Sequence, residues 1–255
     1  MTRSLLLVHT DPDSDREYLR ERGAELQTDL GVLTVPEDAE PGDSLETHLG
    51  EEFRVRRLRG PDLFDHYERT GAPMLPRDVG LIVGETGARA GDTVLDAGTG
   101  TGVLASYLAR LGAEVVTYEV DSEFADVARD NVRLGGVADA VDVRTGDVTD
   151  ELDALADREP GFDLVTLDTA DAPTVVARAP ALLRRGGFLA VYSPFVEDAR
   201  EVALAARDAG LDGVETVETI QRELDVGDRG TRPDTAGVGH SGYLTFARSI
   251  SNRGN

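Results

Sequence analysis

The chain has 255 residues, of which 40% are hydrophobic, so it can form one large domain with a packed core and a second, smaller one. It has no cysteine, which excludes disulfides and thiolate metal sites, and its four histidines lack the spacing of metal ligands, so we expect no metal. No apolar run approaches the roughly 18 residues of a membrane-spanning helix, and the first apolar stretch is too short for a signal peptide. We therefore expect a cytoplasmic protein without membrane contact.

Acidic residues outnumber basic ones 49 to 26, the formal net charge is -23, and every basic residue is arginine. An excess of acids without lysine fits a protein that works in molar salt, where charge repulsion is screened over about 3 Å. This composition indicates a halophilic source. Acidity normally argues against nucleic acid as a partner, but counterion release contributes little to binding in molar salt, so the net charge excludes neither RNA nor protein.

Residues 1–60 predict a small β-rich domain, because short apolar runs at 4–8 and 31–35 are separated by turn-forming residues. Near its end, four arginines fall within six residues: Arg54, Arg56, Arg57 and Arg59. Two interpretations remain open. The arginines neutralise carboxylates on a solvated strand face, or they contact phosphate groups of a nucleic acid.

Prolines at 73 and 76 exclude a continuous helix there, so we place a linker near residues 60–75 and a second domain over 61–255. From residue 78 onward, helix and strand patterns alternate. The expected strands are 93–96, 114–119, 141–145, 164–168 and 187–193, and the expected helices are 78–86, 103–111, 123–134, 174–183 and 198–209. This alternation predicts an α/β fold with a Rossmann-like, mostly parallel sheet covered by helices on both faces.

Two further strand patterns, at 214–223 and 242–247, have no helix between them and predict an antiparallel pair at one edge of the sheet. The segment that joins them, 225–241, predicts a long loop rich in glycine and aspartate. Loops of this length in a compact domain are often functional.

A glycine turn follows the first strand of the second domain, in the sequence Asp96-Ala97-Gly98-Thr99-Gly100-Thr101-Gly102. Such a turn presents bare backbone amides at a helix N-terminus. The spacing departs from that of dinucleotide sites, because Val103 stands where their third glycine belongs. Asp96 would repel a pyrophosphate but can hold an ammonium group, which favours S-adenosylmethionine as the ligand.

Acidic residues stand at or just beyond four predicted strand ends, where parallel sheets bind ligands: Asp96, Glu119, Asp147 and Asp168. Glu119 is placed to bind a ribose, and Asp147 to accept from an adenine amino group that Phe124 covers. The backbone amides that can receive the cofactor carboxylate belong to Thr101, Gly102, Val103 and Leu104. Taken singly, each acid can equally be a cap at a strand-to-helix turn.

Several stretches resemble the tRNA (adenine-N1)-methyltransferase family within the class I S-adenosylmethionine-dependent methyltransferases. In family order over about residues 43–248, they read Thr-His-Leu-Gly-Glu-Glu-Phe-Arg-Val at 47–55, Arg-Thr-Gly-Ala-Pro at 69–73, Pro-Arg-Asp at 76–78, Tyr-Glu at 118–119 and Val-Gly-His-Ser-Gly-Tyr at 238–243. The resemblance implies a homotetramer that methylates N1 of a tRNA T-loop adenosine, at position 58 and in archaeal members also at the adjacent position 57. The chain departs from the family at 168–173, which lacks its prolines and aromatic residue, and at Leu75, where some members have an aromatic residue.

Adenine N1 already carries an in-plane lone pair, so methylation needs alignment and stabilisation of a cationic product rather than a base. Asp168 is placed to accept from the adenine amino group and to take a proton afterwards. Tyr192 either stacks on the target base or is an ordinary strand tyrosine. His240 either anchors its loop or contacts substrate, and Arg54, Arg56 and Arg57 are the candidate tRNA contacts.

Two other functions remain open on the sequence. One is a class I methyltransferase that acts on a protein or a small molecule, which would leave residues 1–60 and 238–243 without an explanation. The other is a non-catalytic tRNA-binding subunit, which would have no need of the glycine turn or of Glu119.

Overall fold

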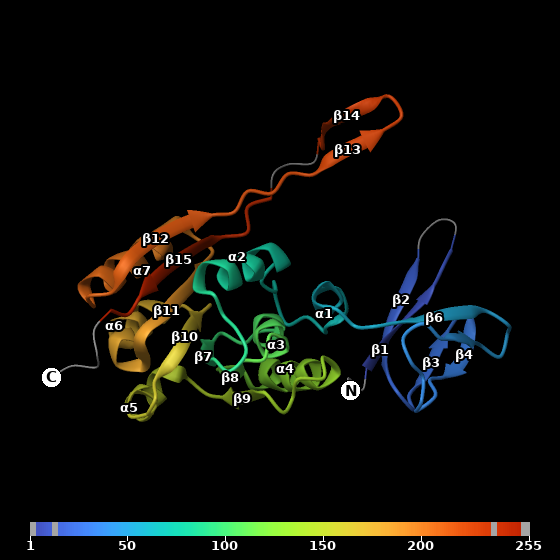
Figure 1. Cartoon of the computed structure of the whole chain (residues 1–255), viewed down its shortest axis with the longest axis horizontal. Helices are drawn as coiled ribbons and strands as arrows, with labels where there is room; N and C mark the ends of the chain where they lie inside the picture. The colour runs from blue at the N-terminus through green and yellow to red at the C-terminus, as the bar shows by residue number, and fades with distance from the viewer. Residues whose placement is uncertain (1–3, 12–14, 236–238, 251–255) are drawn as a thin grey trace.

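The computed structural model describes residues 4–11, 15–235 and 239–250. The N-terminal part consists of short strands (Figure 1): β1 (Ser4–His9), β2 (Arg16–Glu21), β3 (Glu25–Thr28), β4 (Gly31–Thr34), β5 (Ser44–Glu46) and β6 (Glu52–Arg56). An antiparallel sheet has the order β2-β1-β6-β5, and β3 pairs with β4. Apolar side chains of these strands, among them Leu7 and Phe53, form a separate core cluster. The predicted β-rich start of the chain is confirmed.

Two helices, α1 (Gly60–His66) and α2 (Pro76–Thr86), follow this sheet. Buried Leu63 and Tyr67 pack against Leu19 of the first sheet and Val103 of the second domain, in a small cluster at the junction. The Tyr67 hydroxyl donates to Ser106 Oγ at 3.0 Å, and burial raises the pKa of Tyr67 to about 12. We propose that the domains are 1–60 and 61–255, as the sequence predicts, with this cluster between them.

The second domain contains a seven-stranded sheet, confirming the predicted α/β class. Its strands are β7 (Thr93–Ala97), β8 (Glu114–Glu119), β9 (Val141–Thr145), β10 (Phe162–Leu167), β11 (Leu183–Ser193), β12 (Asp212–Glu218) and β15 (Tyr243–Arg248). Their order is β12-β15-β11-β10-β7-β8-β9. Only β15 runs antiparallel to its neighbours, so the predicted antiparallel pair at one edge is β12 and β15.

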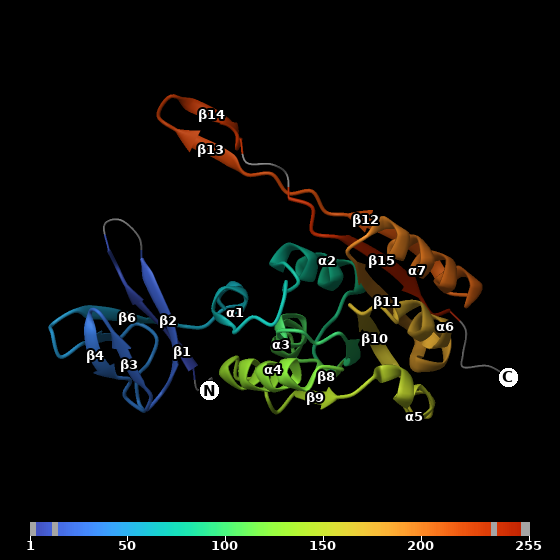
Figure 2. The same cartoon turned by 180° about the vertical axis from the view of Figure 1, so that it is seen from behind.

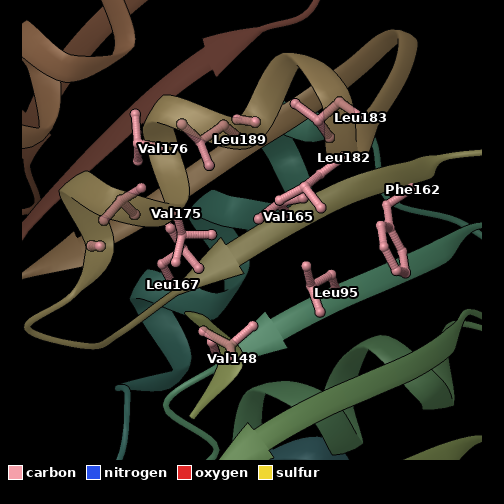
Figure 3. Packing of buried hydrophobic residues seen from close by; sticks show 14 of the residues in the cluster. Leu95, Val148, Phe162, Val165, Leu167, Val175, Val176, Leu182, Leu183 and Leu189 are labelled. Carbon is pink, nitrogen blue, oxygen red and sulfur yellow. The ribbon is translucent and has the colours of Figure 1, made fainter. Parts of the chain in front are cut away.

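Helices cover both faces of this sheet: α3 (Val103–Arg110), α4 (Ser122–Leu134), α5 (Leu152–Ala156), α6 (Ala172–Leu182) and α7 (Val196–Asp208), with a 3-10 turn η1 (Val148–Glu151). Figure 3 shows Leu95 and Val165 packed beneath α6, whereas their neighbours Val94 and Leu164 belong to the cluster on the opposite face. Strands buried on both faces explain the near-continuous apolar runs in the sequence. Among the helices that the described residues form, none is long and apolar enough to cross a membrane.

The segment predicted as a long loop at 225–241 instead contains most of a β-hairpin, β13 (Leu224–Gly227) and β14 (Gly230–Pro233), and β12 ends at Glu218 rather than at residue 223. Figures 1 and 2 both show this hairpin standing away from the sheet. Every hairpin residue is exposed, so neither face of the pair imposes an alternation of apolar and polar residues. The sequence pattern therefore could not reveal these strands.

Candidate active site

The glycine turn joins β7 to α3 and is held by hydrogen bonds to β8. The amides of Gly98 and Thr99 donate to the Tyr118 carbonyl at 3.0 and 3.2 Å, and Gly100 N donates to Glu119 Oε2 at 2.9 Å. Gly98, Gly100 and Gly102 have φ values of +89°, +51° and +76°, which side chains other than glycine rarely adopt. No side chain caps α3, so its first amides remain available to a ligand.

Gly98 also permits the closest approach between two strand ends. A Cβ at this position would collide with the backbone carbonyl of Asp168, and Asp168 N donates to the Ala97 carbonyl at 2.8 Å. Only glycine therefore brings the end of β7 against the end of β10.

A cavity of about 280 Å³ opens beside this turn at the carboxyl ends of the strands. It contains all but one of the predicted cofactor residues: Asp96, Gly98, Gly100, Thr101, Val103, Leu104, Glu119, Phe124, Asp147 and Asp168. The exception is Gly102, which lies outside the wall because it packs against α4; a Cβ there would stand 3.4 Å from Val132 Cγ2. Four carboxylates and no basic side chain appear among the described residues of the wall.

This donor set fits a cationic ligand, because four carboxylates would repel phosphate groups but attract sulfonium and ammonium groups. A Cβ built at Gly100 meets nothing within 4 Å, which leaves room for a ligand beside the turn. S-adenosylmethionine carries both cations and no phosphate, so the cavity fits the predicted cofactor. Among the described residues, no group of His, Cys, Asp and Glu has the arrangement of a metal site.

Asp96 is 3% exposed and lies beneath the cavity. Its Oδ1 accepts from Thr166 Oγ1 and its Oδ2 from Thr117 Oγ1, both at 2.6 Å. Burial raises the pKa of Asp96 to about 6, although these two hydroxyls favour the ionised form. Its contact with a cofactor ammonium remains a prediction.

Glu119 and Asp147 line the cavity and also accept hydrogen bonds from backbone amides around it. Besides Gly100 N, Glu119 accepts from Asp121 N at 3.1 Å through Oε1. Asp147 Oδ1 accepts from Thr149 N at 2.8 Å, and this backbone hydrogen bond lowers the pKa of Asp147. Asp147 is thus the N-cap of η1, as its alternative interpretation required. Phe124 is 38% exposed in the same wall.

Asp168 connects the cofactor cavity to a second cavity of about 330 Å³, because it lines both. Burial, and then the nearby charges of Asp96 and Glu119, raise the pKa of Asp168 to about 7. The second cavity also contains Tyr192, Phe195, Asp198 and other residues of β11 and α7. A planar group held there would meet an acidic residue that also faces the cofactor.

Tyr192 is fixed by the loop that precedes β15. Its hydroxyl donates to the carbonyl of Ser241, and a Cβ at Gly242 would collide with its ring. Burial and the carboxylates of Asp168 and Asp78 raise the pKa of Tyr192. With the hydroxyl engaged, the ring is the part of Tyr192 available to the second cavity.

His240 lies outside the described walls of both cavities, and its contact with substrate remains a prediction. Nδ1 lies 2.7 Å from Glu218 Oε1 and Nε2 lies 3.2 Å from the Pro194 carbonyl. Both partners are acceptors, so both nitrogens donate, and the hydrogen bond with Glu218 raises the pKa of His240 accordingly. His240 therefore anchors its loop; Val238 of the same motif lies outside the described residues.

The arginine run does not form one patch. Arg54 and Arg56 extend from exposed positions of β6, and Arg56 pairs with Glu17 at 3.1 Å and Asp15 at 3.7 Å. Arg57 lies beyond the strand end, in the wall of another cavity. Neither of the cavities that share Asp168 contains any of the three.

The sequence interpretation missed two parts of the site. Residues 70–74, taken as a linker, line the cofactor cavity. Just before them, Asn131 of α4 joins the chain to the glycine turn by donating to the carbonyls of Glu68 and Thr101 at 2.8 and 2.9 Å. Phe195, 66% exposed at the start of α7, lines the second cavity. The signal for Phe195 was a large apolar residue at a loop position directly after Pro194.

The sheet order with one reversed strand, the glycine turn and the acidic cavity define a class I S-adenosylmethionine-dependent methyltransferase. The chain belongs to the tRNA methyltransferase complex GCD14 subunit family, which it matches over residues 68–230.

Similar proteins include the tRNA (adenine(57)-N(1)/adenine(58)-N(1))-methyltransferase TrmI of Methanocaldococcus jannaschii, which is 31% identical over 93% of each chain. Among solved structures, a SAM-dependent O-methyltransferase from Thermotoga maritima has a TM-score of 0.78 and 23% identity, covering 100% of this chain and 95% of its own. The tRNA (m1A58) methyltransferase TrmI from Aquifex aeolicus has a TM-score of 0.71 and 21% identity, covering 97% of each chain. At these identities, both structures support the fold alone.

Proposed function

We propose that this enzyme transfers the methyl group of S-adenosylmethionine to N1 of adenosine in the T-loop of tRNA, at position 58 and also at position 57. The observation that carries the proposal is the place of Asp168 between the acidic cofactor cavity and the aromatic second cavity. Similarity to the methanogen TrmI, named for adenines 57 and 58, extends over 93% of the chain.

In this proposal three of the four strand-end acids each bind a different part of the cofactor. Asp96 attracts the ammonium group, Glu119 binds the ribose, and Asp147 accepts from the adenine amino group beside Phe124. The amides of Thr101, Val103 and Leu104 receive the carboxylate at the start of α3, whereas the predicted Gly102 amide is occupied because it donates to the Thr99 carbonyl at 2.8 Å. When bound, S-adenosylmethionine supplies the methyl group as an electrophile.

Asp168 positions the target base and stabilises its charge. Its carboxylate accepts from the exocyclic amino group, so that the Watson-Crick edge faces the cofactor cavity and the positive charge that develops on the ring is balanced. With a pKa of about 7, Asp168 is also able to take the proton that the cationic product releases.

Aromatic side chains hold the base in the second cavity. The Tyr192 hydroxyl is held by Ser241, and Phe195 is 66% exposed in the wall. A cationic ring between aromatic faces gains about 0.5 to 2 kcal/mol as its charge develops. Phe195 then supplies the aromatic contact that the segment 168–173 lacks.

Arg54, Arg56 and Arg57 remain the proposed tRNA contacts. Arg57 is the strongest of them, because Arg56 pairs with two carboxylates and Arg54 lies 3.9 Å from Glu52. The β13–β14 hairpin supports the expected homotetramer. Leu224 and Val226 are 60% and 75% exposed, and an isolated two-stranded hairpin is marginally stable at best in water. A second copy of the chain would cover these side chains.

The net charge of -23 and the absence of lysine support a halophilic, archaeal source. A tRNA substrate supports a location in the cytoplasm. The decisive experiment is methyl transfer from labelled S-adenosylmethionine to unmodified tRNA transcripts in molar KCl, followed by nucleoside analysis. We expect N1-methyladenosine confined to the T-loop and a loss of about 10²- to 10³-fold in turnover for Asp168→Asn.

Measurements of cofactor binding and tRNA binding, made beside the transfer assay, distinguish the two competing functions. Cofactor binding without any transfer to tRNA would favour a protein or small-molecule substrate. Binding of tRNA without cofactor binding would favour a non-catalytic subunit. Unchanged turnover in Asp168→Asn would contradict the role given to that carboxylate.

A further inference from the structure

A third cavity, of about 360 Å³, lies where the N-terminal sheet meets α3, and we call it the arginine cavity. Among the described residues that line it are Arg22, Arg57, Arg59 and Arg110, and the one acidic residue in this set is Glu40. Four positive charges against one negative charge give this wall a formal charge of +3, in a chain whose total is -23. The charge pattern of the molecule is therefore reversed at this place.

Two of these arginines are fixed by backbone carbonyls. Arg110 donates through Nη2 to the Leu58 carbonyl at 2.7 Å and through Nη1 to the Gly135 carbonyl at 3.0 Å. Arg22 donates through Nε to the Ala39 carbonyl at 2.9 Å, and its Nη2 lies 3.4 Å from Glu40 Oε1. The carbonyls orient Arg110 without neutralising its charge, whereas Arg22 is also paired with Glu40, so the net positive charge of the wall comes from Arg57, Arg59 and Arg110.

Arg57 and Arg59 complete the wall from the segment after β6. Both are exposed, and they flank Leu58, which is 1% exposed and anchors the segment. Within the part of the chain that the structure describes, neither takes part in an ion pair, unlike their neighbour Arg56 with its two carboxylates. Their guanidinium groups are thus available to an anion from outside.

Ser4 adds an independent observation. It is 1% exposed in the wall of the same cavity, and its Oγ has no hydrogen-bond partner among the described residues. Buried hydroxyl groups normally have a partner. A ligand with several acceptor oxygens would supply one.

We infer that the arginine cavity binds a phosphate group, and that this group belongs to the backbone of the RNA substrate. Arginine forks match phosphate oxygens in pairs, and a concave, partly buried site is screened by salt less than an open surface. Arg110 ends the eight-residue helix that starts at the glycine turn, so the site stands about 12 Å along that helix from the cofactor cavity. The choice of RNA rests on the proposed function, whereas the phosphate site does not.

The test compares Arg57→Ser/Arg59→Ser with a control of equal charge change, Arg185→Ser/Arg207→Ser, whose side chains are exposed outside all three cavities. Binding of unmodified tRNA is measured by filter retention over a range of KCl concentrations. We expect the dissociation constant to rise about tenfold in the first variant, with a salt slope smaller by about two, and to change less than twofold in the control. Arg57→Lys/Arg59→Lys should restore part of the affinity, because it keeps the charge but not the fork.

A second measurement identifies the source of the phosphate. Thermal unfolding with inorganic phosphate at constant ionic strength shows whether the wild type is stabilised and whether Arg57→Ser/Arg59→Ser loses the effect. Unchanged tRNA affinity with lost phosphate stabilisation would assign the site to a free phosphate. If neither tRNA binding nor phosphate stabilisation distinguishes the variant from the control, the cavity is no phosphate site. Neither measurement uses methyl transfer, so a failure of the proposed reaction would not decide this test.

Discussion

The two cavities that meet at Asp168 are built in different ways. The cofactor cavity is held by backbone amides, such as Gly100 N to Glu119 and Asp168 N to the Ala97 carbonyl, at the ends of neighbouring parallel strands. The second cavity depends on a contact between Tyr192 and the Ser241 carbonyl and on an exposed Phe195. Backbone hydrogen bonds between strand ends thus define the first cavity, whereas one wall of the second is an exposed side chain.

This difference predicts where substitutions have their largest effects. A change in the cofactor cavity disturbs the sheet itself, because its walls are strand ends and turns. A change at Phe195, which lines the second cavity outside the sheet, should leave the sheet intact and weaken only the proposed contact with substrate. Asp168 lines both cavities, and we expect its substitution to act through the loss of a negative charge rather than through a change in packing.

The largest effect is expected for Gly98→Ala. The added Cβ would collide with the Asp168 carbonyl, and the φ of +89° costs a non-glycine residue roughly 1 to 2 kcal/mol. We expect cofactor affinity to fall at least about 100-fold, as measured by calorimetry with S-adenosylhomocysteine, because the β7 and β10 ends must separate.

Gly91→Ala is the matched control for that substitution. Gly91 has a φ of +87° but a Cβ there meets nothing within 4 Å. It should cost about 1 kcal/mol in the free energy of unfolding and leave cofactor affinity unchanged. An equal loss of affinity in both variants would show that backbone strain, rather than the approach of the two strands, explains the effect.

The sequence could predict the cofactor cavity because its residues lie close together in the sequence or at the ends of apolar runs. Asp96, the glycines and Val103 lie within a few residues of one another, and Glu119 and Asp168 each end an apolar run, so periodicity placed them at one sheet edge. The second cavity required knowledge of which loop closes over β11. Nothing near Tyr192 in the sequence indicates that Ser241, 49 residues later, would accept from its hydroxyl.

Two further features, the hairpin and the arginine cavity, also depend on exposure or on contacts between distant parts of the chain, which the sequence pattern does not record. The hairpin at 224–233 has no buried face, so no pattern marked it. The arginine run was a set of neighbours in the sequence, but β6 ends at Arg56 and directs Arg57 into a different environment. Conversely, Arg22 and Arg110 are distant from Arg57 in the sequence, and only the folded structure places all three in the wall of one cavity.

A smaller effect is expected from pH. The raised pKa values of Asp96, about 6, and Asp168, about 7, mean that both hold protons in the ligand-free fold at pH 5 and lose them as pH rises. A cationic cofactor favours the ionised forms, so its affinity should rise about tenfold between pH 5 and 8. Calorimetry in buffers of different ionisation enthalpy should detect the released protons.

Asp168→Asn should remove the upper part of this pH dependence. The sign for stability is opposite: a pKa above the ordinary aspartate value stabilises the ligand-free fold at low pH, and this contribution is lost as pH rises through 6 and 7. The wild type without ligand should therefore unfold more easily at pH 8 than at pH 5, relative to the variant. A parallel pH profile for both proteins would contradict the raised pKa of Asp168.

The smallest effect is expected for Phe195→Ala, which should lower kcat/KM for tRNA about five- to tenfold through the loss of one aromatic contact. Cofactor affinity should not change, because Phe195 does not line that cavity. Val196→Ala is the control, since Val196 is the next residue, is 55% exposed and lies outside both walls. The chain has no tryptophan, so Phe195→Trp also gives a unique fluorophore. Its emission should be quenched when a base stacks on it, whereas Val196→Trp should respond weakly; equal quenching at both positions would place the base elsewhere.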